Sequence, residues 1–458
     1  MALPCSGASA NSLLAQQSRI AHSRTERVKP WSSFKHYDFS VLWAAQVTMT
    51  MAMTLRLLST SQWIFDETGS AAQLGILGAV QLLQMPVVIY GGALADVMNR
   101  KVLMAMTQSV SFLSLLVLTI LAFGEVLAPW HIWVVTGLTG MVNMLGSSAR
   151  PAMLPRVVPR SHLTNAVTIS TSTMQVAAIT VPFLFGPLYI NFGIGPTLLV
   201  TTCIAAASMI APLIIRSSGA PEEGSAGGVK LQTIIEGFHF VRKHPILPGL
   251  YLLDIGVTIV SFYRMLFPFF SHELYGMGAQ GTAMLTSANA LGGVCGSMVV
   301  FITERWRRKG MIVLVATLIY ALLLFAWGFN RVDLVDNPNL VLSLFDFSWT
   351  INYIFAIGLG LVALLGGTDA VGMTMRQALV QLTAPDNMLG RASSAHSFSA
   401  MGANHLGQME VSFVGGIIGA GNVMVLGGVI SVIVVFAIWR LVPGIRNYRY
   451  RPQRRPRG

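Results

Sequence analysis

Residues 39–65, FSVLWAAQVTMTMAMTLRLLSTSQWIF, decide the fold, and Arg56 is the single charged residue among them. A helix of about 20 residues crosses the hydrocarbon core of a bilayer, so this stretch of 27 residues predicts a membrane-spanning helix. An arginine inside such a helix costs at least about 2.5 kcal/mol unless something compensates for its charge. Arg56 is therefore a candidate functional residue.

The composition extends this interpretation to the whole chain. Of the 458 residues, 53% are hydrophobic and 10% are charged, whereas soluble proteins average roughly 25% charged residues. The sequence is therefore that of an integral membrane protein. The net charge is +12, but the basic residues stand beside apolar spans, so we interpret them as topology signals and expect no nucleic-acid partner.

Enzyme chemistry has no support in the sequence. There is no GxxxxGK(S/T) phosphate-binding loop, and Cys5, Cys203 and Cys295 lie far apart. No cluster of metal ligands and no pairing of a nucleophile with a base stands out. We expect a protein that is not an enzyme and that holds neither a cofactor nor a metal.

The apolar segments predict an all-α membrane protein with twelve transmembrane helices in two six-helix halves. The twelve expected spans are 39–65, 71–94, 102–124, 127–149, 164–190, 194–215, 246–270, 280–302, 310–330, 350–375, 393–419 and 421–441. The expected organisation is a disordered tail (1–35), an N-terminal half (36–216), a linker (217–245), a C-terminal half (246–442) and a basic tail (443–458).

The linker carries a signal of its own. Five apolar residues fall on roughly one helical face, which predicts an amphipathic helix against the inner membrane surface. They are Leu231, Ile234, Ile235, Phe238 and Val241.

Charge sets the orientation. With the N-terminus inside, the inner segments hold 27 of the 30 Lys and Arg residues, and the outer loops hold only Arg331. The positive-inside rule therefore places both termini in the cytoplasm of a multi-pass protein of the cell membrane. The basic C-terminal run RNYRYRPQRRPRG (446–458) and the basic N-terminal tail are expected to contact anionic lipid.

Two ungapped matches reveal an internal repeat. RPAMLPRVVPRSHLTNA (150–166) aligns with RQALVQLTAPDNMLGRA (376–392), which places Arg150 on Arg376. ADVMNRK (95–101) aligns with TERWRRK (303–309), which places Arg100 on Arg308. Two pseudo-symmetric halves related by an axis along the membrane normal predict a transporter with a central cavity.

The repeat also pairs polar residues inside the spans. The offset of the second match brings Arg56 onto Arg264, Gln46 onto Asp254 and Gln81 onto Asn289, and the offset of the first brings Asn143 onto Asp369. Polar groups at equivalent depths are expected to line a shared cavity. The candidate substrate-binding residues are Arg56, Arg264, Gln46, Gln81, Asn143 and Asn289.

The stretch GGALADVMNRKVL (91–103) resembles the signature loop between the second and third helices of the major facilitator superfamily. By this resemblance, Asp96, Arg100 and Lys101 form a charge latch that governs exchange between outward- and inward-facing states. The repeat adds Glu304 and Arg308 to the latch. The alternative for these charges is a set of solvated surface pairs. Val97 and Asn99 depart from the signature, which has arginine and glycine there.

Four further stretches are similar to the branch of that family that holds the enterobactin exporter and macrolide-efflux proteins. They are FDETGSAAQLGILGAVQLLQMP (65–86), ARPAMLPRVVPRSHLTNA (149–166), EGFHFVRKHP (236–245) and APDNMLGRA (384–392). The resemblance implies the major facilitator fold and secondary active transport. The antiporter motif of the fifth helix is incomplete, because Pro182 and Ile190 stand where glycines are expected.

The intramembrane charges leave two interpretations open. Arg56 and Arg264 either anchor an anionic or strongly polar substrate, or pair with Asp254 or Glu410 to fix helix packing. Asp254, Glu410 and Asp369 are candidate proton carriers, because burial raises the pKa of a carboxyl group toward neutrality. Asp369 is near the inner end of its span, where ordinary hydration is the alternative.

The sequence thus predicts a monomeric secondary transporter that exports a small amphiphilic or anionic compound in exchange for protons. An importer with the same architecture is the first alternative, since nothing in the residues encodes direction. A non-transporting receptor or scaffold in the membrane is the second alternative. The expected partners are a small-molecule substrate, protons and the lipid bilayer.

Overall fold

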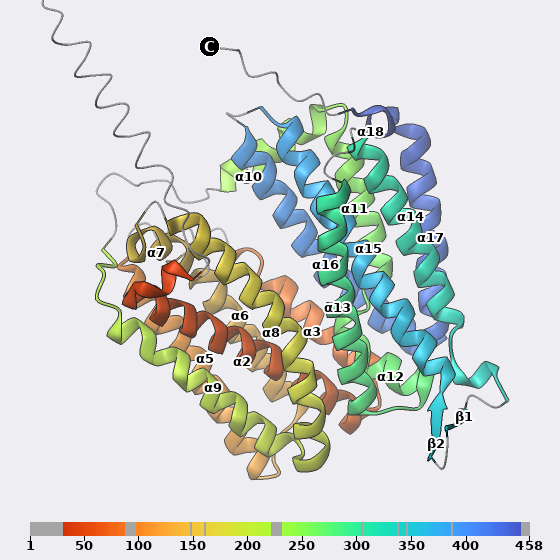
Figure 1. Cartoon of the computed structure of the whole chain (residues 1–458), viewed down its shortest axis with the longest axis horizontal. Helices are drawn as coiled ribbons and strands as arrows, with labels where there is room; N and C mark the ends of the chain where they lie inside the picture. The colour runs from red at the N-terminus through yellow and green to blue at the C-terminus, as the bar shows by residue number, and fades with distance from the viewer. Residues whose placement is uncertain are drawn as a thin grey trace, which may run out of the picture.

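The chain folds into two helical halves joined by a connecting segment, as the computed structural model shows (Figure 1). The structure describes residues 31–87, 98–146, 149–159, 162–220, 231–303, 306, 308–336, 339–344, 347–385 and 388–449. The N-terminal half comprises η1 (Ser32–Lys35), α2 (Tyr37–Thr68), α3 (Ala71–Leu83), α5 (Arg100–Phe123), α6 (Pro129–Gly146), α7 (Ala149–Val157), α8 (Leu163–Phe192) and α9 (Ile194–Ile214).

The connecting segment contributes α10 (Leu231–Lys243), and the C-terminal half follows it. This half comprises α11 (Leu247–Ser261), η3 (Arg264–Leu266), α12 (Phe267–Tyr275), α13 (Ala279–Thr303), α14 (Lys309–Phe329), η4 (Val332–Leu334), β1 (Asn339–Leu344), β2 (Phe347–Asn352), α15 (Tyr353–Thr383), α16 (Leu389–Ile418), α17 (Ala420–Leu441) and α18 (Pro443–Asn447).

The helices confirm the all-α class predicted from the sequence, because each of the twelve expected spans contains a helix. Nine helical segments of the described chain are long and apolar enough to cross a membrane. The predicted linker helix is also present as α10. It buries Val241, which is 4% exposed, while Ile235 on the same helix is 57% exposed.

Four local features differ from the expectation. Ser32–Lys35, expected in the disordered tail, form a 3-10 helix, and Ser33 donates a hydrogen bond of 2.6 Å to the Asn165 side chain. The loop before the tenth expected span forms the antiparallel hairpin β1–β2. The first residues of the expected C-terminal tail form α18. The seventh span is broken between α11 and α12.

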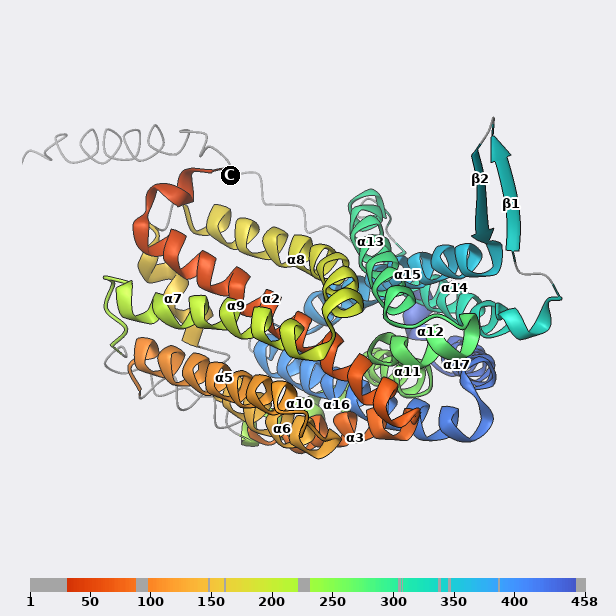
Figure 2. The ribbon, with the colours of Figure 1, turned by 90° about the horizontal axis from the view of Figure 1, so that it is seen from below.

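The two halves meet at one end of the molecule and spread apart toward the other. Figure 1 shows the ribbons diverging toward the end that carries α7, α10 and α18, here called the basic end. The opposite end, which carries β1 and β2, is called the hairpin end. Contacts between the halves are made chiefly by α3 with α16 and by α8 with α13, which Figure 2 shows from below.

Hydrogen bonds tie the halves together toward the hairpin end. Thr282 of α13 donates to the Gln62 side chain of α2 at 2.7 Å, and the Gln408 amide of α16 donates to the Leu74 carbonyl of α3 at 3.2 Å. Phe65 also stacks edge-on against Phe269, with ring centroids 5.9 Å apart. The hairpin end is therefore the closed end of this conformation.

Small residues allow the close approach of α3 and α16. A Cβ atom added at Gly75 would lie 2.8 Å from the Ser412 Cβ, which is closer than van der Waals contact allows. We expect Gly75→Ala to disfavour the closed hairpin end by about 1–3 kcal/mol, as overpacking does elsewhere. Spin labels at positions 67 and 273 would then report an additional, longer distance.

The matched control is Gly360→Ala in α15, where an added Cβ meets no atom within 4 Å. This variant should leave the distance distribution unchanged. A Gly75→Ala protein that is indistinguishable from it would show that the α3–α16 contact does not limit opening.

Packing within the C-terminal half positions the residues discussed below. An added Cβ at Gly292 would lie 1.7 Å from the Ala363 carbonyl oxygen, so only glycine allows α13 to cross α15 this closely. Beside this crossing, the fully buried Trp327 packs against Tyr263 and Phe270, with ring centroids 5.5 Å and 4.9 Å away. The break between α11 and α12 is thus held on a rigid aromatic core.

Candidate functional site

The break in the seventh span presents Arg264 to the interior of the C-terminal half. α11 ends at Ser261, and Phe262 takes an extended conformation with φ −74° and ψ 114°. The helix resumes as α12 with Pro268 in its first turn, where the missing N–H of proline is tolerated. Arg264 lies between the two helices, on η3, with 49% of its side chain exposed.

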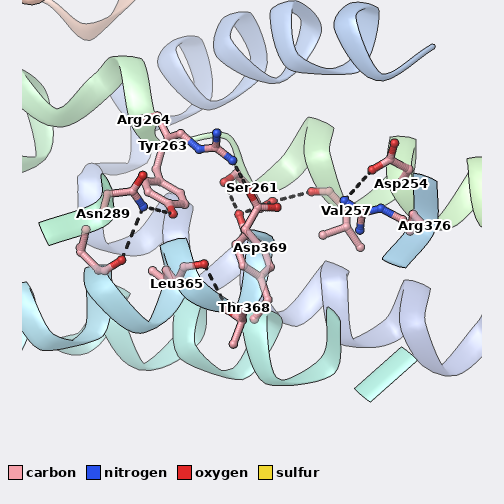
Figure 3. Close-up of polar contacts among 12 residues, drawn as sticks. Asp254, Val257, Ser261, Tyr263, Arg264, Asn289, Leu365, Thr368, Asp369 and Arg376 are labelled. Atoms are coloured by element: carbon pink, nitrogen blue, oxygen red, sulfur yellow. Dashed lines mark hydrogen bonds and ion pairs between the residues drawn. The ribbon is translucent and has the colours of Figure 1, made fainter. Parts of the chain in front are cut away.

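Arg264 forms an ion pair with Asp369 of α15 (Figure 3). The Asp369 side chain is 22% exposed, so the pair is partly open to solvent. Next to it, the Asn289 amide of α13 donates a hydrogen bond of 2.7 Å to the Tyr263 hydroxyl. Three of the residues singled out in the sequence, Arg264, Asp369 and Asn289, therefore come together around Tyr263.

The pair lies in the wall of a cavity that includes open solvent and has an empty volume of about 450 Å³. Helices α11, α14 and α15 supply most of the wall, and Asn404 of α16 completes it. Tyr320 donates to the Ser261 carbonyl at 3.1 Å in this wall. The cavity thus offers a cation, a carboxylate and hydroxyl groups within one small volume.

A second ion pair includes Arg376, which also lines this cavity. Arg376 Nη2 and Asp254 Oδ1 are 2.9 Å apart, with side chains only 9% and 7% exposed. The His396 ring packs against Tyr251 at 5.3 Å, and its Nδ1 is buried without a hydrogen bond among the described residues. Figure 3 shows the two pairs on either side of Val257 and Ser261.

Sequence reasoning missed Arg376 as a site residue. The expected span ends at residue 375, which places Arg376 in an inner loop, but α15 continues to Thr383 and buries it. The alignment of Arg376 with Arg150 was the available signal. Asp254 therefore has its own arginine. The pairs Arg376–Asp254 and Arg264–Asp369 replace the expected alternative in which Asp254 pairs with Arg56 or Arg264.

Arg56 occupies a different environment from its repeat partner. It is 9% exposed, and its Nη1 donates to the Thr136 hydroxyl of α6 at 3.1 Å. Arg56 and Asn143 line one small cleft inside the N-terminal half, with an empty volume of about 260 Å³ that includes open solvent. The described residues supply no carboxylate to Arg56, so the two arginines are equivalent in the repeat but not in their surroundings.

The other candidate residues lie apart from the Arg264–Asp369 pair. Gln46 lines a pocket between α2, α7 and α8. Gln81 is partly buried on α3. Glu410 is partly buried on α16, and its Oε2 has no hydrogen-bond partner among the described residues. Among the described residues, Glu410 therefore does not form the expected ion pair with Arg56 or Arg264.

The latch expected from the sequence is only partly described. Asp96 and Glu304 lie outside the described residues. Arg100 is buried at the start of α5, where its backbone N–H donates to the Gly219 carbonyl at 2.8 Å. The backbone N–H of Lys101 donates a hydrogen bond of 3.0 Å to the Asn99 side chain, and Arg308 is exposed before α14. The latch stays a prediction.

Comparison with known proteins identifies the family of the chain. Residues 42–403 match the family model of the Major Facilitator Superfamily. Among curated proteins, the chain is 26% identical over 306 residues to the enterobactin exporter EntS of Salmonella choleraesuis, covering 66% of this chain and 67% of that protein. It is 24% identical to EntS of Citrobacter koseri over 391 residues, 84% of each chain.

Solved structures show the same fold at low sequence identity. The nucleoside transporter NupG superposes with a TM-score of 0.63 at 12% identity, covering 88% of this chain and 98% of that chain. A D-xylose-proton symporter superposes with a TM-score of 0.65 at 12% identity, covering 90% and 99%. With its family model matched over most of its length, the chain belongs to the Major Facilitator Superfamily and is a multi-pass membrane transporter, not an enzyme.

Proposed function

We propose that this transporter exports a small amphiphilic compound with a polar head group, in exchange for protons, through the cavity at Arg264 and Asp369. The observation that carries the proposal is a partly exposed ion pair in a solvent-open wall, at a break in a membrane helix. Broken helices near the middle of the bilayer are where transporters of this architecture hold their substrates.

The ion pair supplies a mechanism for exchange. While ionised, Asp369 holds Arg264 and can also accept a hydrogen bond from a hydroxyl on the substrate, while Arg264 donates to a substrate oxygen. A proton on Asp369 removes its negative charge, which breaks the ion pair with Arg264 and weakens the hydrogen bond that the carboxyl group accepts from the substrate. Substrate and proton therefore compete for one carboxylate, and competition at a site that alternates between two sides gives exchange.

The conformation fits the export direction. The halves are closed at the hairpin end and diverge toward the basic end. The positive-inside rule, applied to the sequence, supports a cytoplasmic position for the basic end. The cavity would then load substrate from the cytoplasm in this state and release it after the halves rock about the central site.

The same residues also allow an importer. The two directions differ in whether substrate and proton bind together or compete. A fully anionic substrate that displaces Asp369 from Arg264 leaves an unpaired carboxylate, which favours proton uptake. Anion and proton then bind together and cross in the same direction. Exchange requires competition between substrate and proton, whereas cotransport requires that they bind jointly.

The test uses the purified protein in liposomes with an imposed pH gradient and two labelled probes, enterobactin and a macrolide antibiotic. Proposed export predicts that a probe moves against the proton flow and that a protonophore abolishes this movement. Movement of the probe with the protons would replace the proposal by the importer. If the protein is folded but neither binds nor moves either probe, the transport proposal for these compound classes fails.

A further inference from the structure

A second pocket lined by an arginine lies in the N-terminal half, and it shares no described lining residue with the Arg264 cavity. A pocket between α2, α7 and α8 has an empty volume of about 850 Å³, part of it open to solvent. Arg150, at the start of α7, is the one charged residue among the described residues that line it. The walls are mainly apolar and include Phe39, Leu42 and Trp43 of α2 and Leu154 of α7.

Arg150 has no anion within the part of the chain that the structure describes. No described side chain or carbonyl makes a hydrogen bond or ion pair with it, and its Nε is buried without a partner. A partly buried guanidinium with five N–H donors is costly to leave unpaired. The pocket therefore presents a desolvated cation without an internal counter-charge.

The internal repeat explains why the counter-charge is missing. Arg150 aligns with Arg376, and Gln46 aligns with Asp254. In the C-terminal half, the Arg376 guanidinium is neutralised by Asp254 at 2.9 Å. In the N-terminal half, Gln46 lines the same pocket as Arg150, but it is neutral. One half thus carries the anion in its own sequence, and the other half has an amide in its place.

We propose that the Arg150 pocket binds an amphiphilic anion. Two oxygens of a carboxylate or phosphate head group would accept hydrogen bonds from the planar guanidinium. The apolar body of the ligand would lie along Phe39, Leu42 and Leu154. A membrane lipid and a soluble amphiphile can both supply this chemistry. The site depends on neither the direction nor the proton coupling of transport at Arg264.

The pocket contains its own reporter. Trp43 lines it and donates a hydrogen bond of 3.0 Å to Thr173. We expect ω-bromoundecanoate, an anionic amphiphile with a heavy-atom quencher, to quench the fluorescence of the purified full-length protein. Subtracting the signal of the Trp43→Phe variant isolates the contribution of Trp43. The uncharged ω-bromoundecanol should require at least about tenfold higher concentration, because it cannot form the charge-assisted bonds.

Three variants test the counter-charge argument. Gln46→Asp supplies the anion that the C-terminal half already has, so bromoundecanoate binding should weaken at least about tenfold. Gln46→Asn keeps the site neutral and should bind as the unchanged protein does. Arg150→Gln should remove the difference between the acid and the alcohol. The melting temperature of each variant shows whether it is folded.

These measurements distinguish a failed proposal from a lipid occupant and from a soluble one. Equal quenching by acid and alcohol, or equal weakening by Gln46→Asp and Gln46→Asn, would overturn the proposal. In nanodiscs, stronger quenching by brominated phosphatidylglycerol than by brominated phosphatidylcholine identifies a lipid as the occupant. Quenching by the fatty acid without this lipid preference identifies a soluble amphiphile. Loss of transport with intact quenching would count against the proposed export and not against this site.

Discussion

Vesicles carrying the Asp369→Asn protein are expected to lose proton-driven accumulation of substrate entirely, while still equilibrating and exchanging it. Asparagine keeps an oxygen that can accept a hydrogen bond from Arg264, so the cavity stays polar and substrate binding survives in weakened form. However, an amide does not take up a proton near neutral pH, so the proton gradient no longer does work on the substrate. The measurement compares uptake under a pH gradient with exchange at equal pH.

The neighbouring Thr368→Val variant is the matched control. Thr368 lines the same cavity, but its hydroxyl donates to the Leu364 carbonyl of its own helix at 2.8 Å. It should therefore keep both accumulation and exchange. If the Asp369→Asn protein still accumulates substrate, the proton binds at another residue, and Asp254 and Glu410 are the remaining candidates.

Asp254→Asn is expected to destabilise the protein by about 3–5 kcal/mol, because it leaves Arg376 as an unpaired charge in a buried position. Thermal unfolding in detergent measures the effect as a lower melting temperature. The double variant Asp254→Asn with Arg376→Gln removes the unpaired charge and should recover much of the loss. This recovery distinguishes an electrostatic cause from a simple packing defect.

The pair Arg331–Asp333, whose aspartate is exposed, provides the comparison for this prediction. Its nearest atoms are 3.4 Å apart, and Asp333 is 60% exposed. Exposed pairs contribute about 0–1 kcal/mol, so Asp333→Asn should leave the melting temperature nearly unchanged. If Asp254→Asn is as stable as Asp333→Asn, the buried pair does not hold α11 and α15 together.

The helical architecture could be predicted from the sequence because it depends on the hydrophobicity of consecutive residues. Apolar runs of about 20 residues define membrane helices whatever their neighbours are, and the described helices match the expected spans. The alignment of Arg56 with Arg264 also placed both residues inside the membrane region. Their surroundings did not follow from it, because Arg264 lies at a helix break and Arg56 lies in the middle of α2.

The partners of the charged residues needed three-dimensional information. Asp369 and Arg264 are 105 positions apart, and no periodicity within either helix indicates which carboxylate meets which arginine. The hidden role of Arg376 has a simpler cause. A hydropathy pattern ends a span where a charge appears, whereas the charge is tolerated inside the protein when Asp254 pairs with it. Helix ends beside buried charges are therefore where sequence reasoning fails.

In the proposed exchange, the two ion pairs of the C-terminal half also affect how the transporter responds to membrane voltage. An arginine paired with an aspartate carries no net charge, so rocking this half with both pairs intact moves no charge of theirs through the field. A proton on Asp369 would turn one pair into a net cation. A charge that crosses the whole membrane gains about 2.3 kcal/mol per 100 mV, and the rocking movement takes the fraction of this energy that matches the part of the field it spans. In the proposed exchange, the proton-loaded carrier would therefore move one more charge through the field than the empty carrier, in which these two pairs contribute none and Arg56 keeps its own charge.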